Sequence, residues 1–113
     1  MRAELLAVGS ELLVPGRLET NSATITRYLL ERGCKVLART TIADDARALT
    51  ESFKLAWSRA DLVIATGGLG PTEDDLTREC AARALGAALI REPAYVAWLK
   101  ERFKQFGRVM PAV

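Results

Sequence analysis

The sequence predicts an α/β domain in which helices cover both faces of a mostly parallel sheet, so that the fold has three layers. Two of its strand-like runs are almost continuously apolar, as expected for strands that are buried on both faces of a parallel sheet. Helical patterns follow the strand-like runs, and this alternation implies crossover connections with helices on both sides. The length of 113 residues fits one domain, so residues 1–113 form a single predicted unit.

Three runs of the chain predict the strands of this sheet. Ala3–Val8 and Asp61–Thr66 are rich in aliphatic residues, and each run ends at a glycine. Lys35–Thr41 is the second strand in chain order. Leu89–Ile90 is long enough only for a short edge strand.

Four segments place apolar residues three and four positions apart, which is the spacing of one helix face. Glycine follows three of these segments at the position where helices commonly end. Proline opens the fourth segment, in the helical turn that tolerates it best. The predicted helices are Ser22–Arg32, Asp45–Ala60, a third that starts at Thr72 and ends before Gly86, and a fourth that starts at Pro93 and ends before Gly107.

The overall composition narrows the function classes. The net charge is +2, so nothing in it calls for a nucleic-acid partner, which would favour a strongly basic face. No apolar run reaches the roughly 18 residues of a membrane helix, and no signal peptide is recognised, so we expect a cytoplasmic protein without a membrane partner. Cys34 and Cys80 are too few for a disulfide scaffold and are expected to be small core hydrophobes.

The chain contains no histidine, which excludes histidine-based triads and histidine metal sites. Two cysteines cannot supply the four ligands of a structural zinc site. Any bound metal is therefore expected to be a hard divalent cation held by oxygen, such as Mg²⁺ or Mn²⁺.

Polar residues gather where the three predicted strands end. Gly9–Glu11 follows the first strand, Ile42–Asp45 follows the second, and Thr66–Asp75 follows the third. Ligands of open parallel sheets bind beyond the carboxyl ends of the strands, so these three segments predict one binding edge.

The third segment is rich in glycine. Gly67, Gly68 and Gly70 would let the backbone approach a ligand and point amide groups at an anion, and the next helix adds its positive end. The spacing matches neither a Walker loop nor a dinucleotide fingerprint. A tight strand-to-helix turn explains the same glycines, so phosphate binding and simple turn formation both remain open.

Acidic residues follow the glycines and have two interpretations. Thr72 and Asp75 have the spacing of a capping box, which would give Asp75 a purely structural role. Capping explains the adjacent carboxylates of Glu73 and Asp74 less well, because three neighbouring carboxylates repel each other and would welcome a cation. After the second strand, Asp45 can cap the following helix, which leaves Asp44 at the edge of the sheet.

Three stretches resemble one known family. They are Ala7–Leu13, Glu19–Ser22 and Thr66–Thr77, and their order and spacing cover nearly the whole chain. They resemble the N-terminal domain of the competence/damage-inducible CinA proteins, which belong to the molybdopterin-binding MoaB/Mog-like superfamily. The resemblance implies a three-layer domain that binds a phosphate-bearing nucleotide or pterin at the strand ends. CinA-type domains are associated with metal-dependent ADP-ribose pyrophosphatase activity.

The resemblance also implies roles for individual residues. Asp44 and Asp75 match functional aspartates of the Mog-like branch and are the expected catalytic pair. Asp74 and Asp75, with Glu11 as a further candidate, would hold the divalent cation. The expected ligand-binding residues are Gly9, Ser10, Glu11, Asn21, Thr66, Gly67, Gly68, Gly70 and Thr72.

Two alternatives stand beside the hydrolase. The domain can be a non-catalytic module that binds molybdopterin or a nucleotide, or an oligomerising fragment without activity. Family domains continue past the position of Met110 with more strands, so we expect this chain to be truncated and its pocket to be incomplete. The C-terminal amidase domain that CinA proteins often carry is not part of the sequence.

The predicted fourth helix carries an apolar stripe that three strands cannot obviously cover. Leaving several such side chains in water is unfavourable, since each contributes about 1.5–3 kcal/mol when it is fully buried. We therefore expect a homo-oligomer, with a symmetric dimer favoured. The stripe consists of Tyr95, Trp98, Leu99, Phe103 and Phe106, followed by Val109, Met110 and Val113.

Overall fold

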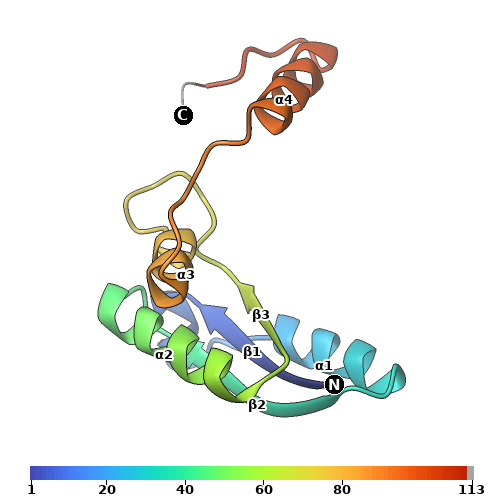
Figure 1. Cartoon of the computed structure of the whole chain (residues 1–113), viewed down its shortest axis with the longest axis vertical. Coiled ribbons are helices and arrows are strands. Elements are labelled where there is room, and N and C mark those ends of the chain that lie inside the picture. Colours follow the sequence, from blue (N-terminus) through green and yellow to red (C-terminus); the bar gives the residue numbers. More distant parts are fainter. Residues whose placement is uncertain (112–113) are drawn as a thin grey trace.

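The computed structural model describes residues 1–111 and is built around a three-stranded parallel sheet (Figure 1). The strands are β1 (Arg2–Val8), β2 (Lys35–Ile42) and β3 (Leu62–Thr66), arranged in the order β2-β1-β3. Both neighbours of β1 run parallel to it. All three strands therefore end at the same edge of the sheet, as the sequence predicts. Val113, the last residue of the predicted apolar stripe, lies outside the described residues.

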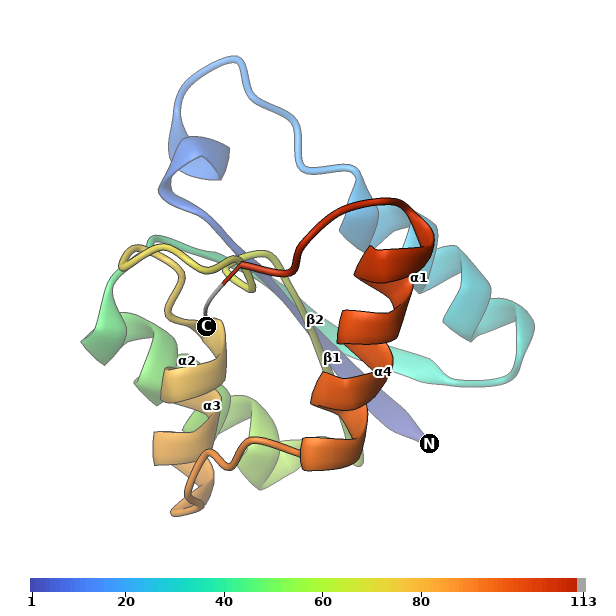
Figure 2. The same cartoon turned by 90° about the horizontal axis from the view of Figure 1, so that it is seen from above.

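Helices cover both faces of the sheet, which confirms the predicted three layers (Figure 2). Helix α1 (Asn21–Glu31) packs Leu29 against Ala3 and Leu5 of β1 on one face. Helices α2 (Ala46–Arg59) and α3 (Thr77–Leu85) pack on the other face. Side chains alternate along a strand, so the central strand contributes to both cores. The second core contains Leu6, Val8, Ile42, Leu49, Phe53, Ala56 and Cys80.

The start of α3 differs from its prediction. The helix begins at Thr77 rather than at Thr72, and residues 72–75 form a turn that precedes it. The Asp75 N–H donates to the Thr72 carbonyl at 3.1 Å, which closes this turn. The capping-box interpretation was therefore wrong for α3, because the Thr72–Asp75 pair satisfies its hydrogen bonds within the loop.

Two smaller expectations also needed correction. The segment between the first strand and the first helix, for which the sequence predicts neither helix nor strand, begins with a short 3₁₀ helix, η1 (Ser10–Leu13). Leu89–Ile90 forms no strand in the part of the chain that the structure describes, and both side chains are exposed. Within residues 1–111, β1 is the strand that pairs with β3.

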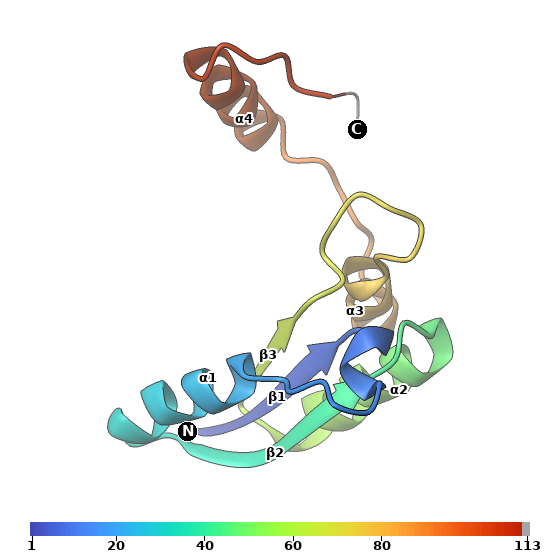
Figure 3. The same ribbon diagram turned by 180° about the vertical axis from the view of Figure 1, so that it is seen from behind.

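Helix α4 (Pro93–Gln105) stands away from the sheet on an extended connection (Figures 1 and 3). None of its residues is buried, although Val96, Leu99 and Phe103 are half-buried. Its predicted apolar stripe therefore splits into a half-buried part and an exposed part, which contains Tyr95, Trp98 and Phe106. Among the described residues, no helix is long and apolar enough to cross a membrane.

Candidate functional site

The ends of β1 and β2 are joined by a reciprocal pair of hydrogen bonds. The Ser10 N–H donates to Asp44 Oδ2 at 3.0 Å, and the Asp44 N–H donates to Ser10 Oγ at 2.9 Å. Beside them, the Gly9 N–H donates to the Ile42 carbonyl at 2.9 Å. Two predicted site residues, Ser10 and Asp44, are thus brought into direct contact although 34 positions separate them in the chain.

Asp45 has the structural role that the sequence predicts for it. Its Oδ1 accepts the Ala48 N–H at 2.8 Å and so caps the N-terminus of α2. The adjacent Asp44 takes no part in this cap. The two neighbouring aspartates therefore have separate roles, and Asp44 is the one that lies with Ser10 at the sheet edge.

The glycines after β3 form a tight turn that packs against β1 and α3. Gly67 and Gly68 have φ angles of 87° and 66°, which L side chains rarely adopt. A Cβ at Gly67 would collide with the Val8 carbonyl, and one at Gly68 would collide with the Thr77 hydroxyl. These packing constraints account for both glycines without a ligand.

Thr77 anchors the glycine turn, although no role was predicted for it beyond its place in the family motif. Its hydroxyl donates to the Gly67 carbonyl at 2.7 Å, and its N–H donates to the Gly68 carbonyl at 3.2 Å. The side chain is buried, with 4% exposed. A threonine at the start of a helix could have indicated this role. The predicted helix starts five residues earlier, at Thr72, so Thr77 was not recognised as the first helical residue.

Asp75 is held firmly inside the loop. Its Oδ2 accepts the Thr72 hydroxyl at 2.6 Å and the Thr72 N–H at 3.1 Å. A Cβ on Gly70 would lie 2.7 Å from the same oxygen, so the glycine makes room for the carboxylate. The Thr72 hydroxyl does most to lower the pKa of Asp75, with further contributions from the N–H groups of Thr72 and Gly70 and from the charge of Arg78.

The acidic residues of the edge do not form a metal cage. Throughout residues 1–111, no group of three or more His, Cys, Asp or Glu side chains is placed to hold a metal ion. Asp74 is exposed beside the half-buried Asp75. Glu11 lines a pocket whose lining includes neither aspartate. The chain thus offers the Asp74–Asp75 pair rather than a complete set of protein ligands.

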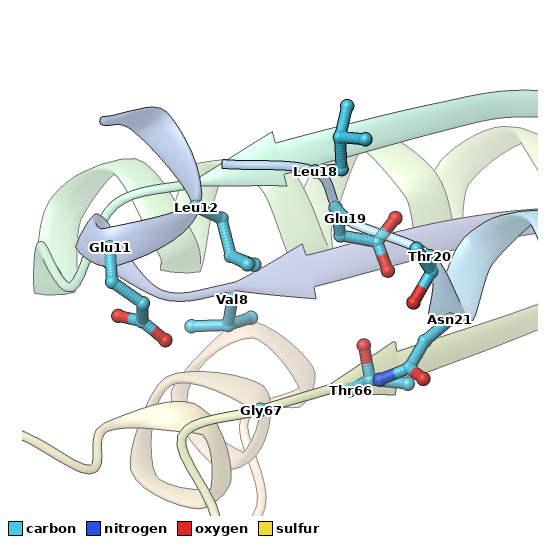
Figure 4. Close-up of a pocket in the computed structure, with 9 residues that line it drawn as sticks. All are labelled: Val8, Glu11, Leu12, Leu18, Glu19, Thr20, Asn21, Thr66 and Gly67. Atoms are coloured by element: carbon cyan, nitrogen blue, oxygen red, sulfur yellow. The ribbon is translucent and has the colours of Figure 1, made fainter. Parts of the chain in front are cut away.

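A pocket of about 200 Å³ opens where η1, the start of α1 and the end of β3 meet (Figure 4). It brings together four of the predicted ligand-binding residues, namely Glu11, Asn21, Thr66 and Gly67. Gly9, Ser10, Gly68, Gly70 and Thr72 do not line it. The remaining lining residues are Val8, Leu12, Leu18, Glu19 and Thr20.

Glu19 is a charged pocket residue for which no separate role was predicted from the sequence. Its Oε1 accepts the Ser22 N–H at 2.9 Å, at the first turn of α1. Burial acts to raise the pKa of Glu19, but hydrogen bonds from Ser22 and Asn21 and the charge of Arg39 outweigh it and lower the pKa. Its position just before a helix start was the signal that could have found it.

A second hollow of about 460 Å³ lies between the glycine loop and the C-terminal segment. Arg78 contributes its cationic side chain to the wall, and its charge also acts on Asp75. The far wall comes from α4 and the residues after it. The lining residues are Leu69, Gly70, Pro71, Arg78, Leu99, Phe103, Met110 and Pro111.

Comparisons with known proteins identify the fold and the family. A family model described as "Probable molybdopterin binding domain" matches residues 4–112. A CinA-like protein of Solibacter usitatus is 44% identical over 113 residues, which are 100% of this chain and 27% of that protein. A CinA-like protein of Deinococcus radiodurans is 44% identical over 111 residues, covering 98% of this chain and 28% of its own length.

Solved structures agree with these matches. The protein CinA from Thermoplasma acidophilum superposes with a TM-score of 0.84 and 33% identity, over 97% of this chain and 64% of that one. The molybdopterin biosynthesis enzyme MoaB from Thermus thermophilus gives a TM-score of 0.67 at 24% identity, over 73% of this chain and 53% of that one, which shows a shared fold.

The family match extends over almost the whole chain, whereas the chain itself spans only about a quarter of the curated relatives it matches. Both the reciprocal Ser10–Asp44 pair and the glycine turn lie within the matched residues. The chain therefore belongs to the molybdopterin-binding domain family and is similar to its CinA-like members.

Proposed function

We propose that this domain binds a phosphate-bearing nucleotide or pterin at the carboxyl edge of the sheet and hydrolyses a phosphoanhydride, as in ADP-ribose pyrophosphatases. The observation that carries the proposal is Asp75. Its carboxylate is fixed in the loop by two hydrogen bonds from Thr72, which also lower its pKa. An ionised carboxylate beside backbone amides and Arg78 suits the recognition of a cation-bound diphosphate.

The carboxylate oxygens of this edge fit a divalent cation that is bound by both protein and substrate. Mg²⁺ in such sites is commonly bound by one or two carboxylates together with phosphate oxygens and water. Asp74 and Asp75 would supply the protein oxygens, in keeping with the absence of a larger acidic group among residues 1–111. The cation would neutralise charge on the diphosphate and favour attack by water.

The protein's own groups would position the reactants. Asp44 keeps acceptor capacity beyond its bond from Ser10, so it can orient the attacking water and take its proton. The water oxygen forms a bond to one phosphorus, and the bond from that phosphorus to the bridging oxygen breaks. Two phosphate monoesters result. Arg78 and the backbone amides of the glycine loop would stabilise the charge on the phosphates.

A non-catalytic binding module is the second candidate. The matched family is described by binding rather than by catalysis. The glycines of the loop are explained by packing against Val8 and Thr77, so they give no separate support to transition-state stabilisation. In this alternative the same edge would hold molybdopterin or a nucleotide without turnover.

Calorimetry with ADP-ribose tests the proposal. We expect binding that strengthens when Mg²⁺ or Mn²⁺ is present and weakens when a chelator removes it. Chromatography of the reaction mixture should then show the two monophosphate products. Binding that is indifferent to the chelator, with no products formed, would support the binding module instead.

Replacement of Asp75 by asparagine separates chemistry from loop structure. Asp75→Asn keeps an oxygen that accepts the Thr72 bonds, so we expect little change in Tm. Removing the charge should lower metal-dependent turnover by about 100-fold or more. The matched control is Glu73→Gln, which removes the same charge two residues away. Equal turnover in the two variants would contradict the role of Asp75.

A further inference from the structure

The pocket beside α1 differs in character from the glycine loop. Its nine lining residues include two carboxylates, Glu11 and Glu19, and neither lysine nor arginine. Figure 4 shows Glu11 and Glu19 on opposite sides, with Val8 between them. A phosphate group placed in this pocket would meet two negative charges, and no lysine or arginine lines the pocket to balance them. The pocket therefore favours a neutral part of a ligand over an anionic part.

Glu11 and Glu19 are both positioned by the backbone around them. The missing side chain of Gly9 leaves the space that the Glu11 carboxylate occupies. Glu19 is fixed by its bond from the Ser22 N–H at 2.9 Å. A carboxylate has about four acceptor sites, so Glu19 keeps acceptor capacity after binding the start of α1. The pocket thus presents two carboxylate acceptors to which a ligand can donate hydrogen bonds, and Glu19 is the one held by a hydrogen bond.

The remaining lining fits a small ring. Val8, Leu12 and Leu18 provide apolar surface, while Asn21 and Thr66 provide groups that both donate and accept hydrogen bonds. Pockets for whole drug-sized ligands measure about 300–1,000 Å³. A volume of about 200 Å³ is therefore suited to one ring rather than to a complete nucleotide.

We propose that this pocket binds the neutral, donor-bearing ring of the phosphate ligand, with Glu19 as the acceptor that selects it. The ring is a ribose or a pterin. The ribose diol offers paired O–H donors to a carboxylate, and the amino group and adjacent ring N–H of a pterin offer paired N–H donors. Gly67 lines the pocket and also belongs to the glycine loop, so the ring and the phosphates can occupy adjoining places. This inference rests on the proposed function and specifies which part of the ligand lies where.

Calorimetry with four probes tests the assignment: inorganic pyrophosphate, ADP-ribose, ribose 5-phosphate and 6-hydroxymethylpterin, each with Mn²⁺ present. Glu19→Gln retains an oxygen for the Ser22 N–H but removes the charged acceptor. We expect it to weaken binding of the ring-bearing probes about tenfold and to leave pyrophosphate binding unchanged. A loss confined to ribose 5-phosphate and ADP-ribose would assign the donors to the sugar, and a loss confined to the pterin would assign them to the base.

Two further variants control this experiment. Glu31→Gln removes a charge from the last residue of α1 and should bind every probe as the unsubstituted chain does. Thr66→Val changes the pocket from β3 without touching α1, and it should reproduce the selective loss. Equal affinities in Glu19→Gln and Glu31→Gln would overturn the inference while leaving the proposed function intact. A loss of Mn²⁺ binding alone in Glu19→Gln would make the pocket a cation site and also overturn it. Failure of every probe to bind the unsubstituted chain would overturn both proposals.

Discussion

At the scale of single residues, Glu4 carries a charge into the middle of the central strand. Its side chain is only 2% exposed, and Arg59 at the end of α2 donates to it through two nitrogens, at 2.6 and 2.9 Å. A bidentate pair satisfies both carboxylate oxygens and offsets part of the desolvation of the buried charge. The pair also ties α2 to β1 across 55 positions of the chain.

Arg59→Met tests this pairing, because methionine keeps much of the apolar stem and removes the charge. Leaving the Glu4 carboxylate buried without a counter-charge should lower the free energy of unfolding by about 3 kcal/mol. Urea unfolding measured by circular dichroism gives this value. Replacing both partners, as in Glu4→Leu with Arg59→Met, should recover much of the loss. An unchanged midpoint in the single variant would show that the pair contributes nothing measurable.

The role of a residue could be predicted from the sequence where it depends on neighbouring residues in the chain or on the order of the strands. Asp45 precedes a clear helical pattern, so its cap on α2 was foreseen and is confirmed. The contact of Ser10 with Asp44 followed from two parallel strands that end at one edge. Thr77 and Glu19 were not assigned roles, because their functions depend on where a helix begins and on which loops meet in space.

At the scale of elements, apolar runs located all three strands to within one residue at each end. The error came at the start of α3, where a threonine and an aspartate three residues apart fit two structures equally well. The same two side chains can cap a helix or close a turn, and only the packing of Thr77 against the glycines selects the turn. The exposed Leu89–Ile90 formed no strand, because no neighbouring strand is placed beside it among the described residues.

Two alanine substitutions separate the cost of a left-handed backbone from the cost of a steric collision at Gly67. Gly16 and Gly67 have almost the same φ, 86° and 87°, but a Cβ at Gly16 would meet no atom within 4 Å. Gly16→Ala should therefore cost about 1 kcal/mol for the left-handed backbone alone. Gly67→Ala should cost clearly more, because the Val8 carbonyl must also move. Chemical denaturation of both variants measures the difference, and equal losses would contradict the steric role of Gly67.

At the scale of the whole molecule, α4 is the helix that does not pack against the three-stranded sheet. Tyr95 and Trp98 stack with their ring centroids 5.4 Å apart, and the Arg102 guanidinium lies 5.5 Å from the Trp98 ring centroid. Both rings stay more than half exposed, at 58% and 52%. The sequence predicted the apolar stripe correctly but could not show which part of it faces the glycine loop and which faces solvent.

The exposed part of α4 leads to a prediction about assembly. We propose that two copies of the chain associate through Tyr95, Trp98 and Phe106, because a symmetric dimer would remove these rings from water on both subunits. Light scattering over a dilution series should show the mass falling from dimer to monomer. Trp98→Glu should shift the dissociation to higher concentration by at least tenfold, since it would bury a charge at the centre of the contact. Leu30→Glu changes a leucine on α1 that is similarly exposed, at 57%, and should leave the mass unaltered. A monomer at every concentration, in both the unsubstituted chain and Trp98→Glu, would mean that these rings serve another purpose than self-association.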